Sequence, residues 1–259
     1  MEGWISAGND PGEDMRVPLE RTADLERLDM VAWRAREAGL AALTFVVPDR
    51  APEPWLPAVL AAARRHRSGP LRILVGVEAR VTSGKGHLSL PGCPPGIDRL
   101  YATLDRLPNA VSSHTALELR EAFEDGRTSA HEIVARTLEV LRATVRRNPR
   151  VVLSRPFALL SAAGIPEDRV DESALEDLAW DVVAAGASIQ VDEWERTPRA
   201  GAVSVFAAAG VELLCGTGTR DTEGVGVYDY VCRLMQRVPA FAEGVNARCA
   251  AQNGFRIRA

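Results

Sequence analysis

The stretch Val211-Glu-Leu-Leu-Cys-Gly-Thr-Gly-Thr-Arg-Asp-Thr-Glu-Gly-Val-Gly226 indicates the fold class. It opens with a short apolar run that ends at Cys215, which is typical of a buried strand. Two glycines then interrupt the strand, Arg220 and Asp221 follow, and a helical pattern resumes near Tyr228. A strand that ends in a glycine-rich polar turn before a helix is where α/β proteins carry their chemistry. We therefore expect an α/β fold with a functional site at this turn.

Composition limits the class of protein and of partner. The 259 residues are 46% apolar and 25% charged, and no linker or internal repeat divides them, so we expect one domain over residues 1–259. The sequence shows no apolar run long enough to span a bilayer and no secretory leader, and its four cysteines lack C-x-x-C spacing, so we expect a reduced cytoplasmic protein. The net charge of −4, with no basic stripe, argues against a nucleic-acid partner, and the lack of a bilayer-spanning run argues against a membrane partner. Of 31 basic residues, only Lys85 is a lysine.

Alternating strand and helix patterns run along the chain. Apolar runs predict strands near residues 4–5 and over 41–47, 71–78, 97–103, 151–154, 187–192 and 211–215. Helical periodicity predicts helices over 22–38, 54–66, 127–147, 174–185, 201–209, 225–237 and 240–250, the third and fourth with capping boxes at Ser129/Glu132 and Ser173/Glu176. Residues 8–18 read as a loop, 80–90 as a hairpin and 104–126 as a long connection.

This order implies parallel strands joined by right-handed crossovers. Either a closed barrel or an open doubly wound sheet would satisfy it. No G-x-G-x-x-G motif opens the first helix, which lowers the expectation of a dinucleotide-binding sheet. We therefore predict a TIM-like barrel whose site lies at the carboxyl ends of its strands.

Charged residues recur at the predicted strand ends. Read together, these ends supply several carboxylates and three arginines and no histidine: Asp49, Arg50, Glu78, Asp105, Arg155, Asp192, Glu193, Arg220 and Asp221. Surface ion pairs are the plain alternative, since charged side chains are mostly exposed. Their recurrence after strand upon strand favours a shared pocket.

Four blocks of sequence resemble the polymerase and histidinol phosphatase (PHP) family. The first, Ala35–Arg50, is similar to the family's A-x-x-x-G-L-x-x-I-x-I-T-D-H, and Val75–Glu78 matches its G-x-E strand end. Asn148–Pro156 resembles N-P-x-V-x-I-x-H-P, and Leu213–Gly226 resembles I-x-x-G-S-D-x-H followed by V-G. The blocks span most of the chain in the family's order. The resemblance implies a distorted seven-stranded β/α barrel.

The chain departs from this family at the positions that hold its metals. No counterpart of the opening D-x-H-x-H is found around residues 4–6. The T-D-H block falls on Val46–Pro48 without a gap, or on Pro48–Arg50 with a shift of two residues. Arg155 stands at the histidine of the H-P block.

The last block has also lost its ligands, because Gly218 and Arg220 stand at its aspartate and histidine. Only Glu78, and Asp49 if the shift is allowed, remain of the carried-over ligands. Such a set is too small for a zinc, manganese or iron cluster, so we expect neither a metal nor another cofactor, and no metal-dependent hydrolysis.

An arginine-lined pocket suits an anionic small molecule, because guanidinium groups bind phosphate, sulfate and carboxylate bidentately. We expect Arg50, Arg155 and Arg220 to bind it, with Thr217 and Thr219 of the turn and His114 of the long connection. Glu78, Asp192 or Glu193 would act as the base for C–O cleavage by elimination or ring closure.

Two alternatives stay open. The chain would otherwise be an inactive PHP relative that stabilises a partner subunit, or a metal-dependent phosphoesterase whose ligands align elsewhere. Association with copies of itself or with a second chain fits any of these readings.

Overall fold

The computed structural model describes residues 12–19, 26–50, 55–66, 71–109 and 113–254. Seven strands form one parallel sheet in the order β1-β2-β3-β4-β7-β8-β9. These strands are β1 Glu13–Pro18, β2 Ala42–Pro48, β3 Arg72–Arg80, β4 Arg99–Thr103, β7 Val152–Ser154, β8 Ser188–Asp192 and β9 Glu212–Gly216. A separate antiparallel ribbon joins β5 Arg106–Pro108 to β6 Ser113–Thr115.

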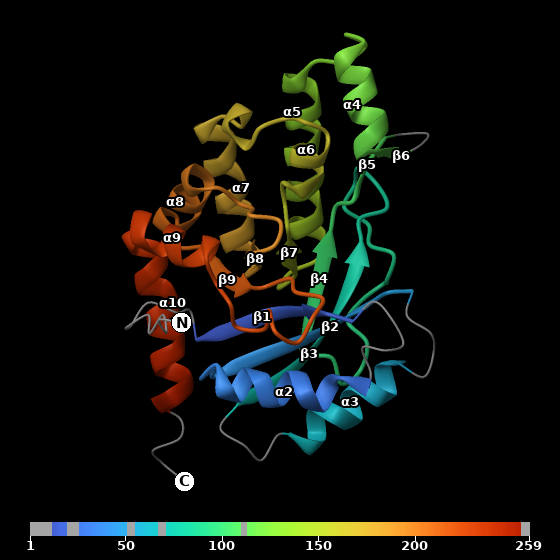
Figure 1. Ribbon diagram of the computed structural model, residues 1–259. Helices are drawn as coiled ribbons and strands as arrows, with labels where there is room; N and C mark the ends of the chain where they lie inside the picture. Colours follow the sequence, from blue (N-terminus) through green and yellow to red (C-terminus); the bar gives the residue numbers. More distant parts are fainter. Residues whose placement is uncertain (1–11, 20–25, 51–54, 67–70, 110–112, 255–259) are drawn as a thin grey trace.

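Helices connect the strands and surround the sheet (Figure 1). They are α2 Leu28–Glu37, α3 Trp55–Arg65, α4 Ala116–Glu124, α5 Ala130–Arg147, α6 Ala158–Ala162, α7 Glu172–Ala184, α8 Ala200–Ala208, α9 Tyr230–Arg237 and α10 Pro239–Gly254, with a 3₁₀ turn at Glu167–Arg169. In Figure 1, α2 and α3 cover β1 to β3 on one side, while α5, α7 and α8 cover the later strands. The apolar core follows this division, with one buried cluster under each group of helices.

The first and last strands of the sheet lie side by side and nearly close a barrel. The backbone N–H of Gly218 donates to the carbonyl of Arg16 at 3.1 Å. The Asp14 carboxylate accepts from the Thr217 N–H at 2.9 Å and from the Thr217 hydroxyl at 2.6 Å. We call these contacts the β1–β9 seam. They confirm the predicted seven-stranded TIM-like barrel over the open doubly wound sheet.

The barrel interior is filled by side chains. One buried cluster comprises Met15, Ala42, Val46, Leu74, Tyr101, Val152 and Leu214, which come from six of the seven strands. The Tyr101 hydroxyl, which is fully buried, donates to the Met15 carbonyl. Gly76 leaves room for the ring, because a Cβ there would lie 2.6 Å from Tyr101 Cε2. With its interior filled, the barrel can accept a ligand only at one of its ends, which is where barrels of this kind carry their sites.

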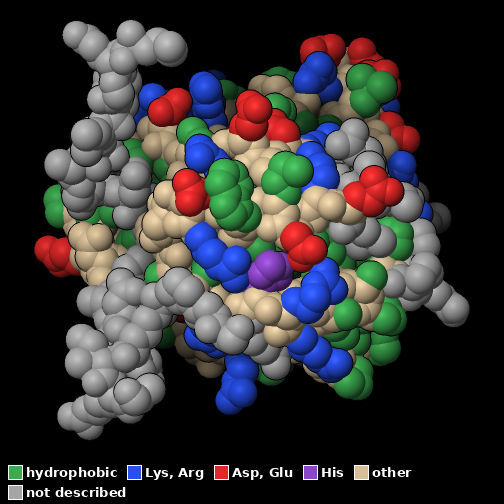
Figure 2. All heavy atoms as spheres, turned by 60° about the horizontal axis from the view of Figure 1, so that its bottom comes forward, with side chains coloured by type: hydrophobic (Ala, Val, Ile, Leu, Met, Phe, Trp, Pro, Cys, Tyr) green, Lys and Arg blue, Asp and Glu red, His purple; other side chains and the backbone are tan. Residues whose placement is uncertain are grey.

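The face that α2 and α3 present to solvent mixes basic and acidic side chains around a histidine (Figure 2). There Asp29 accepts from Arg65 at 3.0 Å and lies 2.8 Å from the His66 ring. Since charges of both signs are interleaved and paired, this face is an ordinary solvated surface.

The structure corrects three details of the sequence interpretation. The predicted loop at residues 8–18 contains strand β1, while the strand predicted near residues 4–5 lies outside the described residues. The connection at 104–126 holds β5, β6 and α4, which begins with its own capping box at Thr115/Glu118. The box at Ser129/Glu132 is confirmed, but α7 starts at Glu172, so Ser173 lies inside the helix instead of capping it.

Candidate functional site

Arg16 lies at the centre of a polar cluster at the carboxyl ends of the strands, which we call the barrel mouth. Its Nη2 is 3.0 Å from Glu78 Oε2, and its Nη1 is 3.8 Å from Asp192 Oδ2. The Arg16 side chain is 4% exposed and the Asp192 side chain is fully buried. Strand β1 therefore places a permanent cation between carboxylates from β3 and β8.

Arg155 is the second cation of this cluster. It directly follows β7 and adopts a left-handed backbone conformation, with φ of 50°. Its Nη2 lies 3.4 Å from Glu78 Oε1 and 3.3 Å from Thr103 Oγ1, and its Nη1 lies 3.6 Å from Glu195 Oε1. A non-glycine residue in this region costs about 1–2 kcal/mol. Such strain persists where surrounding contacts fix the residue, which is common at functional sites.

Glu78 joins the two arginines. Burial alone would raise the pKa of its carboxyl, but the charges of Arg16 and Arg155 and hydrogen bonds from Arg16 and Ser154 lower the pKa to about 2. The Ser154 hydroxyl lies 2.9 Å from Glu78 Oε1 and 2.8 Å from Gln190 Oε1, and its one proton serves either. A carboxylate held at so low a pKa is a weak general base near neutral pH.

Asp192, the second predicted base, is enclosed. Its carboxylate accepts from Gln190 Nε2 at 2.7 Å and from the Glu195 backbone N–H at 2.8 Å. Burial raises the pKa of Asp192, while Arg16 opposes that shift. With its side chain fully covered, Asp192 orients Arg16 and the turn after β8.

Glu193, the third predicted base, binds the start of α9. It accepts from the backbone N–H groups of Tyr230 at 2.7 Å and of Val231 at 2.9 Å. A carboxylate at this position satisfies free helix donors and matches the positive end of the helix dipole. Its oxygens are thus engaged in holding α9 against the mouth.

The two threonines of the turn after β9 also have structural partners. Thr217 donates to Asp14 in the β1–β9 seam, and burial raises the pKa of Asp14 to about 6 despite these hydrogen bonds. The Thr219 hydroxyl lies 3.2 Å from the carbonyl and 3.3 Å from Oδ1 of Asp221. Both side chains shape the turn.

The remaining predicted ligand-binding residues lie further out. Arg50 is exposed after β2, and Arg220 is exposed in the turn after β9, where its carbonyl accepts from Arg27 at 2.9 Å. His114 lies on β6, with its Nε2 2.9 Å from Asn109 Nδ2. The structure thus brings together Glu78, Arg155 and Asp192 around Arg16, and holds Arg50, Arg220 and His114 on separate segments.

Sequence reasoning missed Arg16, Asp14, Ser154, Gln190 and Glu195. The missed signal for the first two is Asp14-Met-Arg-Val-Pro18, which has the spacing of D-x-H-x-H with arginine and proline at the histidine positions. The motif therefore lies on β1, and not near residues 4–6, where the strand predicted from the sequence would place it. Ser154, Gln190 and Glu195 carry no motif of their own, and only the barrel shows that they meet.

The donor set at the mouth does not fit the metal cluster that the PHP resemblance implies. Across the described residues, no group of three or more His, Cys, Asp and Glu side chains is placed to hold an ion. Glu78 and Asp192 instead face the guanidinium of Arg16, whose charge would repel a divalent cation.

Comparisons with known proteins do not assign the chain to a family. No family profile matches the sequence, and no curated protein matches it. Among solved structures, three mutant forms of the organophosphorus hydrolase from Deinococcus radiodurans are similar. One is 12% identical with a TM-score of 0.38 and covers 95% of this chain and 92% of its own. The others are 12% and 11% identical, with TM-scores of 0.37 and 0.35, and cover 97% and 92% of this chain and 100% and 91% of their own.

At these values the similarity adds nothing to the site, and the barrel assignment rests on the strand order and the β1–β9 seam. In the described part of the chain, none of the helices combines the length and apolarity needed to cross a membrane. What the findings establish is a nearly closed, seven-stranded parallel β/α barrel with an arginine–carboxylate cluster at its mouth.

Proposed function

We propose that this protein binds an anionic small molecule at the barrel mouth through Arg155, without a metal centre. The two arginines that contact Glu78 differ in solvent exposure. Arg16 is 4% exposed and lies between Glu78 and Asp192, whereas Arg155 is 21% exposed. The Nε of Arg155 is buried and has no hydrogen-bond partner among the described residues. This unpartnered donor, on a side chain that solvent reaches in part, is the observation that carries the proposal.

The ligand class follows from the geometry of a guanidinium. Two parallel N–H donors match a phosphate, sulfate or carboxylate group, and these charge-assisted hydrogen bonds are the strong ones. The contacts of Arg155 are long, at 3.4 Å to Glu78, 3.3 Å to Thr103 and 3.6 Å to Glu195. An incoming anion can therefore replace Glu195 at little cost, while Glu78 keeps Arg155 in place.

The reaction proposed for the mouth needs a base, and we assign that role to Glu195. It is 41% exposed and touches Arg155, while Glu78, Asp192 and Glu193 are engaged as described above. In an elimination, Glu195 would take a proton from the carbon next to the C–O bond. The C–H electrons would form the double bond, and the phosphate or sulfate would leave with the C–O electrons, bound to Arg155.

Ligand-induced stabilisation tests the binding proposal. Inorganic phosphate, sulfate and small carboxylates should raise the melting temperature, and a ligand at a hundred times its Kd stabilises by about 2.7 kcal/mol. The rise attributable to the mouth should be lost in Arg155→Gln and kept in Arg147→Gln, which removes an exposed arginine of α5. Unchanged affinity in Arg155→Gln would overturn the proposal. A second chain that co-purifies without any anion effect would favour the partner-subunit alternative.

A further inference from the structure

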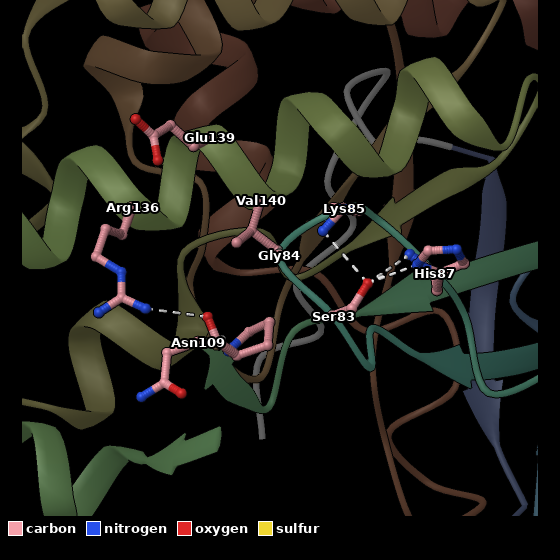
Figure 3. Close-up of a pocket in the computed structure, with 9 residues that line it drawn as sticks. Ser83, Gly84, Lys85, His87, Asn109, Arg136, Glu139 and Val140 are labelled. Atoms are coloured by element: carbon pink, nitrogen blue, oxygen red, sulfur yellow. Dashed lines mark hydrogen bonds between the residues drawn. The ribbon is translucent and has the colours of Figure 1, made fainter. Parts of the chain in front are cut away.

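A pocket lies outside the barrel mouth, between the hairpin that follows β3, the end of β5 and the middle of α5 (Figure 3). We call it the hairpin pocket. Its volume is about 410 Å³, within the range of small-molecule sites. It is lined by Ser83, Gly84, Lys85, His87, Pro108, Asn109, Arg136, Glu139 and Val140.

The walls of this pocket are fixed before any ligand arrives. Gly86, with φ of 73°, packs so closely on α5 that a Cβ there would lie 2.4 Å from the Ala143 backbone. Asn148 Nδ2 donates to the Gly86 carbonyl at 2.9 Å and to the Thr144 carbonyl at 2.8 Å. These contacts anchor the hairpin to the helix, so the pocket is preorganised.

The polar groups within it are also oriented. The Ser83 hydroxyl accepts from the backbone N–H groups of Lys85 and His87, both at 3.3 Å, and lies 2.7 Å from His87 Nδ1. Arg136 Nη2 donates to the Pro108 carbonyl at 3.2 Å. Figure 3 shows Arg136 extending from α5 toward Asn109, with Ser83 and His87 across the pocket.

The charge of the lining is basic, in a chain whose net charge is −4. Lys85 and Arg136 are cations, and His87 adds a ring that can donate. The lining includes a single carboxylate, that of Glu139, which lies three residues after Arg136 on α5. Lys85, the only lysine in the sequence, sits here although arginine is the usual cation elsewhere.

We propose that the hairpin pocket binds the phosphate group of a small molecule. Lys85 and Arg136 supply the two positive charges that match a phosphate dianion, and His87 supplies a further hydrogen-bond donor. The site shares no lining residue with the barrel mouth. The phosphate-binding proposal for the hairpin pocket is therefore independent of the function proposed for the barrel mouth.

The single lysine allows a test at this site alone. Reductive methylation with ¹³C-formaldehyde labels only Lys85 and the terminal amine, and it preserves their charge. Titration with inorganic phosphate at constant ionic strength should shift the Lys85 resonance saturably, whereas sodium chloride should not. The shift should disappear in Arg136→Gln and persist in Arg147→Gln and Arg155→Gln. A response equal to that of chloride, or one unchanged in Arg136→Gln, would refute the phosphate site.

The unsubstituted protein provides a second measurement. Phosphate should slow acylation of Lys85 relative to chloride, as measured by mass spectrometry of the peptide that contains Lys85. Equal rates would overturn the proposal without recourse to any variant. Titrating glycerol 2-phosphate beside inorganic phosphate distinguishes a site for phosphate esters from one for the free ion. If phosphate binding persists in Arg155→Gln but is lost in Arg136→Gln, the barrel-mouth proposal fails and the hairpin pocket remains.

Discussion

Arg16 places a permanent cation between two carboxylates that the barrel covers, and its removal should be costly. Arg16→Met removes the cation that contacts Asp192 and leaves Glu78 with Arg155 alone. Breaking a buried charge pair from one side destabilises by about 3–5 kcal/mol. We expect a loss of that order in urea denaturation, with a smaller loss in Arg155→Gln because water already reaches that side chain. Equal stabilities of the wild type and Arg16→Met would contradict the assignment.

Asp14 makes the free energy of unfolding fall as pH rises, whereas a carboxylate whose pKa is lowered by folding has the opposite effect. Burial raises its pKa from 3.8 to about 6, so the folded state binds a proton more tightly than the unfolded state does. Its stabilising contribution is present below pH 3.8 and is lost as pH rises through 6. The full shift corresponds to about 3 kcal/mol, since one pKa unit is about 1.4 kcal/mol.

Urea denaturation of the wild type and of Asp14→Asn at pH 5 and pH 7.5 tests the contribution of Asp14 to the free energy of unfolding. The wild type should lose about 1.4 kcal/mol relative to the variant between these values, by the linkage relation. Glu78, whose pKa is depressed from 4.5 to about 2, contributes stability that is lost only as pH falls below 4.5, so it does not disturb the comparison. Parallel pH profiles of the two proteins would exclude the shift at Asp14.

At the scale of elements, the hairpin after β3 packs closely on α5 at Gly86, whereas Gly84, two residues earlier, makes no close contact. Gly86→Ala introduces a Cβ 2.4 Å from the Ala143 backbone and forces alanine into a left-handed conformation. The conformation alone costs about 1–2 kcal/mol, and the contact adds to it. We expect loss of stability and loss of the Lys85 response to phosphate.

Gly84→Ala is the matched control, because nothing lies within 4 Å of a Cβ at that position. Its free energy of unfolding should stay within about 0.5 kcal/mol of the wild type, as for surface substitutions. If both variants behaved alike, close packing of the hairpin on α5 would not be what shapes the pocket.

The elements that sequence predicted well are those whose apolar runs face the core on both sides. Strands β2, β3, β8 and β9 are almost wholly buried and were found within two residues. Strand β1 was missed because it carries Glu13, Asp14 and Arg16 in buried positions, against the pattern expected of a strand. Those charges are tolerated because partners from β3, β8 and β9 reach them across the barrel.

At the scale of the whole molecule, barrel closure decides which residues meet, and a linear sequence does not display it. Glu78, Arg155 and Asp192 are identifiable from the sequence because each lies within two residues of the end of a recognisable strand. Glu195 is not identifiable from the sequence, because it lies three residues beyond β8 and only the turn after that strand brings it to Arg155. Arg50 and Arg220 also follow strands, by two and four residues, yet their side chains are exposed, so following a strand does not by itself place a side chain in the mouth.

Closure around Arg16 also predicts how the molecule responds to metals. The guanidinium already occupies the space between Glu78 and Asp192, and a divalent cation would have to displace it against like charge. We expect purified protein to contain zinc, manganese and iron far below one equivalent by elemental analysis, and its melting temperature to be unchanged by a chelator. Added Mn²⁺ or Zn²⁺ should likewise give no stabilisation, whereas phosphate should. Stoichiometric metal that stabilises the fold would show that the mouth rearranges to release Arg16, and would restore the metal-dependent phosphoesterase alternative.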